Sequence, residues 1–173
     1  MMLKKNNPNA LTYANLSFGF LSILELFNKE YILSAVFILI AAFIDRYDGK
    51  IARYLQVTSD IGKELDSLAD LVSFGVAPAL LIFHKFTYSE LGSLKLFGIG
   101  ILLLYVISGS YRLGRYNTAH YSNGFQGVPI TIAGTALALY SLLPNRPINL
   151  LISVFILFIF STLMIAKFRI KKI

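Results

Sequence analysis

Four aspartates in an otherwise apolar chain have a spacing that could hold metal ions: Asp45, Asp48, Asp66 and Asp70. The 173 residues include only nine acidic side chains, and six of these fall between positions 45 and 70. The first two aspartates are three residues apart and the last two are four apart, so each pair shares one face of a helix. Turn and cap residues between the pairs predict a second helix that runs back antiparallel to the first. The two carboxylate pairs are therefore expected to face each other.

Clustered carboxylates without histidine or cysteine nearby are typical of sites for hard, oxygen-seeking cations such as Mg²⁺, Mn²⁺ or Ca²⁺. Four negative charges held together repel one another, and two divalent ions would neutralise them. Two such ions about 3.5–4 Å apart can stabilise both sides of a phosphoryl transfer. Two other interpretations stay open: the aspartates solvate helix ends and pair with nearby bases, or they line the ion path of a transporter. The nearby bases are Arg46, Lys50, Arg53 and Lys63.

The composition indicates a membrane protein. Hydrophobic residues make up 56% of the chain and charged residues only 14%, which is less charge than a soluble domain of this size carries. The formal net charge of +7 fits basic loops at a membrane surface and contact with anionic lipid, and we expect no nucleic-acid partner. The chain has no cysteine, which excludes disulfides and thiolate metal sites.

We expect an all-α integral membrane protein, a single domain over residues 1–173, with six transmembrane helices around a polar cavity that opens to the cytoplasm. The expected helices cover about residues 11–27, 31–54, 64–86, 93–116, 128–143 and 147–166. The second helix turns polar at Asp45 without a helix breaker, so it is expected to continue beyond the hydrocarbon core. Turn residues fill 55–63, a polar loop fills 117–127, and a kink is expected at Pro78.

Six spans place both termini on one side of the membrane, and the distribution of basic residues tests this topology. Of the sixteen basic side chains, twelve fall on the side of the termini and four on the other. The four are Lys29, Lys85, Lys95 and Arg146. Because basic residues concentrate in cytoplasmic loops, we expect a multi-pass protein of the cell membrane with both termini and the active site at the cytoplasmic face. The basic tail, residues 167–172, is expected to contact anionic lipid.

The aspartates belong to a longer pattern. Asp45-Arg-Tyr-Asp48-Gly49-Lys-Ile-Ala52-Arg53 is followed, after eight residues, by Gly62-Lys-Glu-Leu-Asp66-Ser-Leu-Ala-Asp70. This pattern resembles the signature of the CDP-alcohol phosphotransferases, and all eight signature residues are present. The resemblance extends over the whole chain in its size and its number of spans. It implies a two-metal site that holds the pyrophosphate of a CDP-linked lipid while an alcohol attacks the lipid-side phosphate and CMP leaves.

The resemblance also implies roles for individual residues. The four aspartates would ligate two divalent ions, Mg²⁺ or Mn²⁺, with Ca²⁺ able to occupy the same site. Asp70 would also be the catalytic base that takes the proton from the attacking hydroxyl. The residues expected to contact the CDP-lipid are Asn9, Thr12, Asn15, Gly49, Ala52, Arg53, Ser59 and Gly62. Gly49 and Ala52 also suit close helix packing, Arg53 an ion pair, and Ser59 a helix N-cap. The three residues of the first span also suit the polar start of a helix.

A second pattern bears on the acceptor alcohol. Arg112-Leu-Gly-Arg115-Tyr-Asn117, with a glycine-x-proline segment after Gln126, is similar to the phosphatidylserine synthase branch of the family. The similarity implies transfer of the phosphatidyl group, or its archaeal ether-lipid equivalent, from CDP-lipid to L-serine. Either arginine could bind the serine carboxylate bidentately, and Asn117 or Gln126 could hydrogen-bond the head group. The arginines would also suit the phosphate of glycerol-phosphate or inositol-phosphate, the acceptors of sister branches, or an anchor at lipid head groups.

The partners that follow from the resemblance are CDP-diacylglycerol or CDP-archaeol, L-serine and membrane lipid. Acyl-ester and isoprenoid-ether tails are both compatible with the sequence. The resemblance also implies a homodimer.

Overall fold

The chain folds as a bundle of helices. The computed structural model describes residues 7–55, 60–86, 92, 95–118, 125–166 and 169–170. The α-helices are α1 (Asn7–Phe27), α2 (Tyr31–Leu55), α3 (Asp60–Asp70), α4 (Ala77–Lys85), α5 (Lys95–Thr118), α6 (Ile130–Ser141) and α7 (Pro147–Ile165). A π-helix, η1 (Leu71–Val76), joins α3 to α4, so these three elements form one continuous helical rod. The all-helical prediction is confirmed, apart from one pair of two-residue strands.

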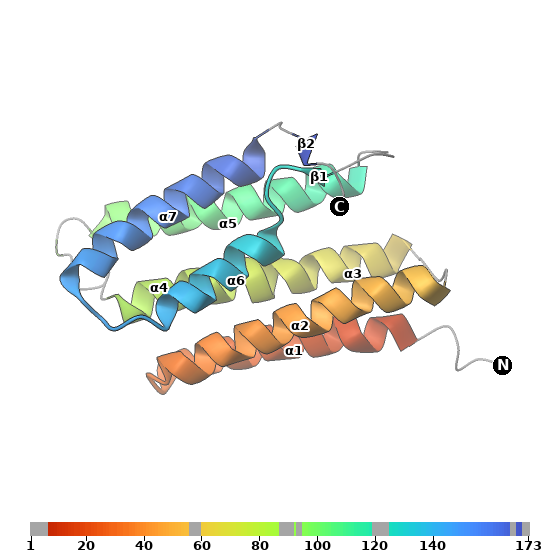
Figure 1. Ribbon diagram of the computed structural model, residues 1–173, viewed down its shortest axis with the longest axis horizontal. Coiled ribbons are helices and arrows are strands. Elements are labelled where there is room, and N and C mark those ends of the chain that lie inside the picture. The colour runs from red at the N-terminus through yellow and green to blue at the C-terminus, as the bar shows by residue number, and fades with distance from the viewer. Residues whose placement is uncertain are drawn as a thin grey trace.

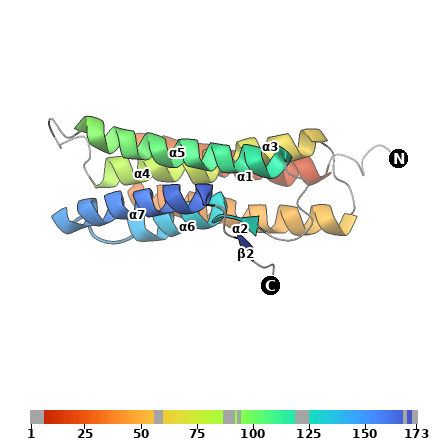
Figure 2. The ribbon, with the colours of Figure 1, turned by 90° about the horizontal axis from the view of Figure 1, so that it is seen from above.

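The bundle has two layers of three rods each (Figures 1 and 2). One layer holds α1, the α3–η1–α4 rod and α5, and the other holds α2, α6 and α7. Helices α1 and α2 pack closely together at one edge of the bundle, and α5 and α7 pack at the other edge. The end of α2 and the start of α3 lie at the same end of the bundle. The aspartates of the second and third predicted spans are thereby brought to one end.

The helix ends differ from the sequence prediction by up to four residues, and one pair of short strands was not predicted. Helix α1 begins at Asn7 rather than near 11. The helix that begins at Asp60 was expected to begin near 64, because a threonine, a serine and a glycine suggested a longer turn. The strands β1 (Phe125–Gln126) and β2 (Arg169–Ile170) pair antiparallel, although the sequence predicted a loop and a tail there. A two-residue strand is too short to produce the alternation of apolar and polar residues by which strands are recognised.

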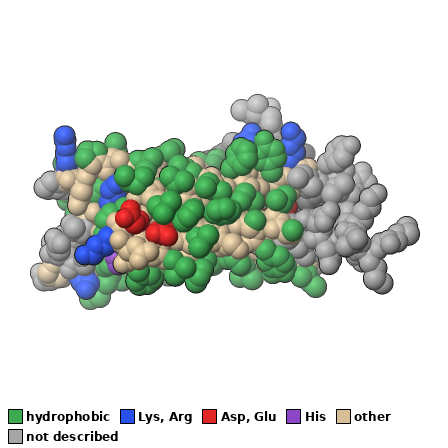
Figure 3. Space-filling model, turned by 90° about the horizontal axis from the view of Figure 1, so that it is seen from below, with side chains coloured by type: hydrophobic (Ala, Val, Ile, Leu, Met, Phe, Trp, Pro, Cys, Tyr) green, Lys and Arg blue, Asp and Glu red, His purple; other side chains and the backbone are tan. Residues whose placement is uncertain are grey.

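Four helices are long and apolar enough to cross a membrane, which indicates a multi-pass membrane protein. Among the described residues these candidate spans are Ala10–Phe27, Ile61–Lys85, Lys95–Thr118 and Ile148–Ile165. Hydrophobic side chains cover the middle of the face shown in Figure 3, and charged side chains gather toward its ends. This distribution suits a bundle whose middle lies in lipid.

The other two rods, α2 and α6, have shorter apolar stretches. In α2 the uncharged run ends at Ile44, after 14 residues from Tyr31, which is about 21 Å of helix. Helix α6 has 12 residues, which is about 18 Å of helix. Both lengths are less than the roughly 30 Å of a bilayer core. Six full spans therefore stay a prediction. The two helices with short apolar stretches carry Asp45 and Thr131, respectively.

The π-helix η1 forms directly before Pro78, where the sequence predicted a kink. Proline has no N–H, so it cannot donate to the carbonyl of Phe74 four residues earlier, and its ring crowds that carbonyl. The hydroxyl of Tyr105 on α5 donates to this Phe74 carbonyl at 2.8 Å, and the Tyr105 side chain is fully buried. This bond fixes the position of α5 along the central rod.

The segment that leads into α6 is held against the end of α7. The backbone N–H of Val128 donates to the carbonyl of Leu163 at 3.2 Å. Gly127 has a φ of 69°, and a Cβ there would lie 2.5 Å from the carbonyl oxygen of Met164. Only glycine fits both the left-handed conformation and this close approach. The glycine-x-proline segment noted in the sequence therefore has a structural role.

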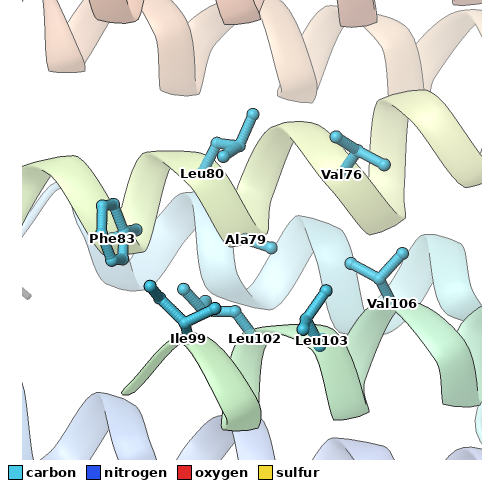
Figure 4. A pocket seen from close by; sticks show the side chains of 8 residues that line it. All are labelled: Val76, Ala79, Leu80, Phe83, Ile99, Leu102, Leu103 and Val106. Carbon is cyan, nitrogen blue, oxygen red and sulfur yellow. The ribbon is translucent and has the colours of Figure 1, made fainter. Parts of the chain in front are cut away.

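An apolar pocket of about 380 Å³ lies between the central rod and α5 (Figure 4). Its lining is entirely hydrophobic, with Val76, Ala79 and Phe83 on one side and Ile99 and Leu102 among those on the other. The pocket lies along the apolar part of two candidate spans, and it contains none of the aspartates.

The bond between Tyr105 and Phe74 leads to a first prediction. Replacing Tyr105 by phenylalanine leaves the Phe74 carbonyl buried without this donor, which costs about 1–3 kcal/mol. The unfolding temperature of the purified protein in detergent should therefore fall by several degrees. Tyr111→Phe is the matched control, because Tyr111 lies on the same helix and is exposed. Equal unfolding temperatures for the two variants would contradict the assignment.

Candidate metal and substrate site

Three of the four predicted aspartates meet in space. One carboxylate oxygen each from Asp45, Asp66 and Asp70 lies within 4.8 Å of the other two. Asp45 comes from the last part of α2 and the other two from successive turns of α3. Asp70 is buried, whereas Asp45 is more accessible. The arrangement of α2 and α3 thus brings three of the four carboxylates together, whereas the spacing predicted that both pairs would meet in full.

Asp48 borders this cluster and is held by α1. The hydroxyl of Thr12 donates to Asp48 Oδ2 at 2.5 Å, and both side chains are buried. The other oxygen, Asp48 Oδ1, is buried and has no hydrogen-bond partner in the described structure. A carboxylate oxygen left in this state has lost its hydration without compensation. It is therefore available to a cation.

Asn15 links the first helix to Asp70. Its side-chain amide donates to Asp70 Oδ1 at 3.2 Å, and the Asn15 side chain is fully buried. The hydroxyl of Ser73, in η1, donates to the backbone carbonyl of Asn15 at 3.0 Å. Gly19, one turn further along α1, faces Ser73 so closely that a Cβ would lie 2.8 Å from the Ser73 Cα. The close approach of α1 to η1 therefore brings the amide of Asn15 within reach of Asp70.

Thr131 is a site residue that the sequence analysis missed. Its hydroxyl donates to Asp45 Oδ2 at 3.5 Å, although the two residues are 86 positions apart. Thr131 lies in the first turn of α6, two residues after Pro129. A polar residue at the start of a mostly apolar helix was the signal in the sequence, and such residues are common at helix starts.

The two aspartates of α2 have raised proton affinity. Burial raises the pKa of Asp45 above its ordinary value, and the neighbouring charge of Asp48 raises it further, while the bond from Thr131 acts in the opposite direction. Burial also raises the pKa of Asp48, against the bond from Thr12. Both shifts reflect poorly solvated carboxylates, and that of Asp45 also reflects a like charge nearby. A bound cation would favour the ionised forms.

The cluster therefore fits a metal site in this part of the chain. It offers only carboxylate oxygens, the ligands that hard divalent cations prefer. Three of these oxygens already lie close together, and Asp48 adds a buried oxygen without a partner.

The two predicted acceptor-site arginines have different surroundings. Arg112 is buried, its Nε has no hydrogen-bond partner in the described structure, and its charge acts on Asp70. Arg115 instead donates to the carbonyl of Ile165 at 3.0 Å and to that of Met164 at 3.4 Å. These carbonyls lie in the last turn of α7, where a cation is stabilising. Arg115 thus ties α7 to α5, and Arg112 lies beside the aspartates.

Asn117 connects the end of α5 to α3. Its side-chain amide donates to Ser67 Oγ at 2.9 Å and to Glu64 Oε1 at 3.4 Å. Ser67 follows Asp66 directly in the sequence, so this bond holds α5 next to the cluster. The sequence analysis did not predict that Ser67 or Glu64 contacts the acceptor motif. Both residues are far from that motif in the sequence, so no local pattern indicates the contact.

The remaining predicted residues lie on α1, α2, α3 and β1 or outside the described residues. Gly49 is exposed on α2, and Gly62 is partly buried on α3. The backbones of Asn9, Ala52, Arg53 and Gln126 lie in α1, α2, α2 and β1, respectively, and Ser59 lies outside the described residues. Roles of these residues in binding CDP-lipid or serine stay predictions.

Comparison with known proteins identifies the family. Residues 5–168 match the family described as CDP-alcohol phosphatidyltransferase. This match covers nearly the whole chain, so the chain belongs to the CDP-alcohol phosphatidyltransferase family. The resemblance inferred from the aspartate signature is thereby confirmed.

Curated relatives point to one branch of that family. The chain is 38% identical over 139 residues to CDP-diacylglycerol–serine O-phosphatidyltransferase of Bacillus subtilis, covering 80% of this chain and 76% of that protein. It is 33% identical over 142 residues to the enzyme of the same name from Helicobacter pylori, covering 80% of this chain and 58% of the relative. It is 34% identical over 138 residues to archaetidylserine synthase of Methanothermobacter thermautotrophicus, covering 78% of this chain and 57% of the relative. The chain thus spans under two thirds of the length of two of these relatives.

The carboxylate cluster leads to a prediction that needs no turnover. Adding Mg²⁺ or Mn²⁺ to the metal-free protein should raise its unfolding temperature, because a ligand at a hundred times its Kd stabilises the folded state by about 2.7 kcal/mol. For Asp66→Asn the half-maximal metal concentration should rise at least about tenfold, since even indirect partners change metal affinity that much. Glu30→Gln, an exposed acidic residue outside the cluster, should respond as the native protein does. Metal-independent unfolding of the native protein would argue against the site.

Proposed function

We propose that this protein is a CDP-diacylglycerol–serine O-phosphatidyltransferase, or the equivalent enzyme for ether lipids. It would transfer the phosphatidyl group from a CDP-linked lipid to L-serine and release CMP. The observation that carries the proposal is the meeting of Asp45, Asp66 and Asp70 within 4.8 Å, next to the buried Arg112. A carboxylate cluster can hold metal and accept a proton, and the guanidinium can hold the carboxylate of an amino acid.

Two divalent ions, Mg²⁺ or Mn²⁺, held by the four aspartates would supply the positive charge that offsets the pyrophosphate of the CDP-lipid. The chain's own residues keep the aspartates in place for this. Thr12 and Thr131 hold carboxylates of α2, and Asn15 holds Asp70. Each of these three donors is neutral, so it restrains a carboxylate without competing with a cation for charge.

Asp70 is the proposed base. A carboxylate oxygen of Asp70 takes the proton from the serine hydroxyl as the serine oxygen forms a bond to the lipid-side phosphorus. The bond from that phosphorus to the oxygen of CMP breaks, and CMP leaves with the electron pair. Asn15 donates to Asp70 Oδ1 and so restrains one of the two carboxylate oxygens.

Serine is the acceptor that the surroundings of Arg112 favour. A free amino acid brings a carboxylate that a guanidinium binds with two parallel hydrogen bonds. Arg115 is occupied with the end of α7, which leaves Arg112 as the residue of the pair beside Asp70. Two of the relatives are named CDP-diacylglycerol–serine O-phosphatidyltransferase, and a third is named archaetidylserine synthase.

In the membrane, the six rods would place the aspartates at the cytoplasmic face, in a polar cavity open to the cytoplasm. The short apolar stretch of α2 supports this arrangement, because Asp45 would then lie near the head groups. The CDP-lipid would approach from the bilayer with its nucleotide near the signature residues of α2 and α3 and the polar residues of α1. A homodimer is also part of the proposal, and it derives from the family resemblance alone.

Measuring CMP release with several acceptors tests the proposed reaction. The purified protein is supplied with CDP-diacylglycerol, Mg²⁺ or Mn²⁺, and L-serine, glycerol-phosphate or inositol-phosphate in turn. CMP should appear with L-serine and stay at background with the phosphorylated polyols. Release with a polyol phosphate would move the protein to a sister branch. No release with any alcohol, together with metal-dependent solute flux in vesicles, would favour a transporter. Replacing CDP-diacylglycerol by CDP-archaeol in the same assay identifies the lipid.

The role of Asp70 gives a separate prediction. Asp70→Asn removes the base, so serine-dependent CMP release should fall by at least about a hundredfold, the lower end of the contribution of a general base. The variant keeps the size of the side chain, and its unfolding temperature is measured alongside to confirm that it folds. A folded Asp70→Asn protein with near-native turnover would remove Asp70 from the role of base.

A further inference from the structure

Two buried donors on α5 lack partners within the described structure. They are Ser108 Oγ and Arg112 Nε, on side chains that are 0% and 6% exposed. Buried polar groups in folded proteins nearly always have a hydrogen-bond partner, because desolvation without one is costly. Two unpaired donors one helical turn apart therefore suggest that something binds there.

Ser108 differs from the other buried serines of the described chain. Ser141, Ser153 and Ser161 donate to carbonyls of their own helices. The remaining three also have partners: Ser22 bonds Ser34, and Ser73 bonds the Asn15 carbonyl. A serine within a helix readily donates to a carbonyl three or four residues earlier, and Ser108 does not.

The position of Ser108 along α5 is set by bonds on either side of it. Before it, Tyr105 bonds the Phe74 carbonyl of η1; after it, Asn117 bonds Ser67 of α3. Because α5 runs antiparallel to the central rod, the stretch between these bonds lies beside the segment from Ser67 to Phe74, which contains Asp70. Residues four apart share a helix face, so Ser108 and Arg112 are placed on the same side.

Arg112 and Asp70 interact electrostatically without direct contact between their charged groups. The charge of Arg112 acts on Asp70, yet no ion pair joins these two described residues within 4 Å. In serine, two carbon atoms separate the carboxylate carbon from the hydroxyl oxygen. Serine thus carries at its two ends the groups that Asp70 and the donors of α5 would bind.

We propose that Ser108 is a specificity residue whose hydroxyl, together with Arg112, donates to the carboxylate of the acceptor amino acid. The inference rests on the proposed function and adds to it a residue outside both sequence motifs. Ser108 supplies a neutral donor one helical turn before Arg112 along α5. An acceptor without a carboxylate would leave both donors unpaired, and a site built to hydrogen-bond a substrate rejects analogues that lack the bonded group.

The test is Ser108→Ala, assayed for formation of the serine lipid with purified protein. KM for L-serine should rise about tenfold or more, as expected for losing a hydrogen bond to a charged group, while kcat and KM for the CDP-lipid stay within about threefold. The phosphates of the CDP-lipid are the other anions that these donors would suit. A rise in KM for the CDP-lipid with no change for serine would assign Ser108 to phosphate and overturn the proposal.

Two inhibitors show which group Ser108 contacts. L-Alanine has the carboxylate and the ammonium but no hydroxyl to react, so its inhibition constant should rise with KM for serine in Ser108→Ala. 2-Aminoethanol has the ammonium and the hydroxyl but no carboxylate, so its inhibition constant should stay unchanged. Equal changes for both inhibitors would indicate a general packing effect and overturn the proposal.

Matched variants complete the experiment. Ser110→Ala changes an exposed serine of the same helix and should behave as the native protein. Ser108→Cys keeps the size of the side chain but donates weakly, so it should resemble Ser108→Ala if the hydroxyl matters. If the native protein uses serine and Ser108→Ala has native-like kinetics, only the proposed role of Ser108 is overturned. Native protein that uses no serine would overturn the proposed function and this inference with it.

Discussion

Carboxylates that lie close together in poorly solvated surroundings repel one another, and the rest of the site is built around this constraint. Neutral donors from two other helices, Thr12 and Asn15 of α1 and Thr131 of α6, bond three of the four aspartates. Such bonds stabilise the ionised form but leave net negative charge. The helices thus hold the aspartates in position while the unbalanced charge favours a cation, as the proposed metal site requires.

The π-helix η1 determines how closely the other helices approach the aspartates. Gly134 of α6 lies so close that a Cβ would be 2.6 Å from the Cα of Phe74, and Gly19 makes the matching approach from α1. Tyr105 of α5 bonds the Phe74 carbonyl that Pro78 leaves without its usual donor. Three helices are therefore fixed against η1, which directly follows Asp70. A local irregularity next to a site is a common feature of π-helices.

The sequence predicted the parts of the structure that depend on local spacing. The apolar runs predicted the helices with small errors at their ends. The intervals between aspartates predicted that both pairs would meet, and three of the four aspartates do. Contacts made by long-range packing gave no local signal, as Thr131 and Ser67 show. The same holds for the β1–β2 pair, and for η1, whose Phe74 carbonyl accepts a hydrogen bond from a tyrosine 31 residues later.

The two arginines of the second motif show why spacing alone leaves the acceptor site open. Three residues apart on one helix, Arg112 and Arg115 are neighbours in the sequence pattern, yet the first is buried beside Asp70 and the second caps α7. The difference arises because α5 packs against two elements at once, the central rod and α7. The proposed metal site lies on α2 and α3, whereas the proposed surroundings of the acceptor lie on α5 against that rod. With this division, the chemistry on α2 and α3 would stay the same while residues of α5, such as Ser108 and Arg112, select the acceptor.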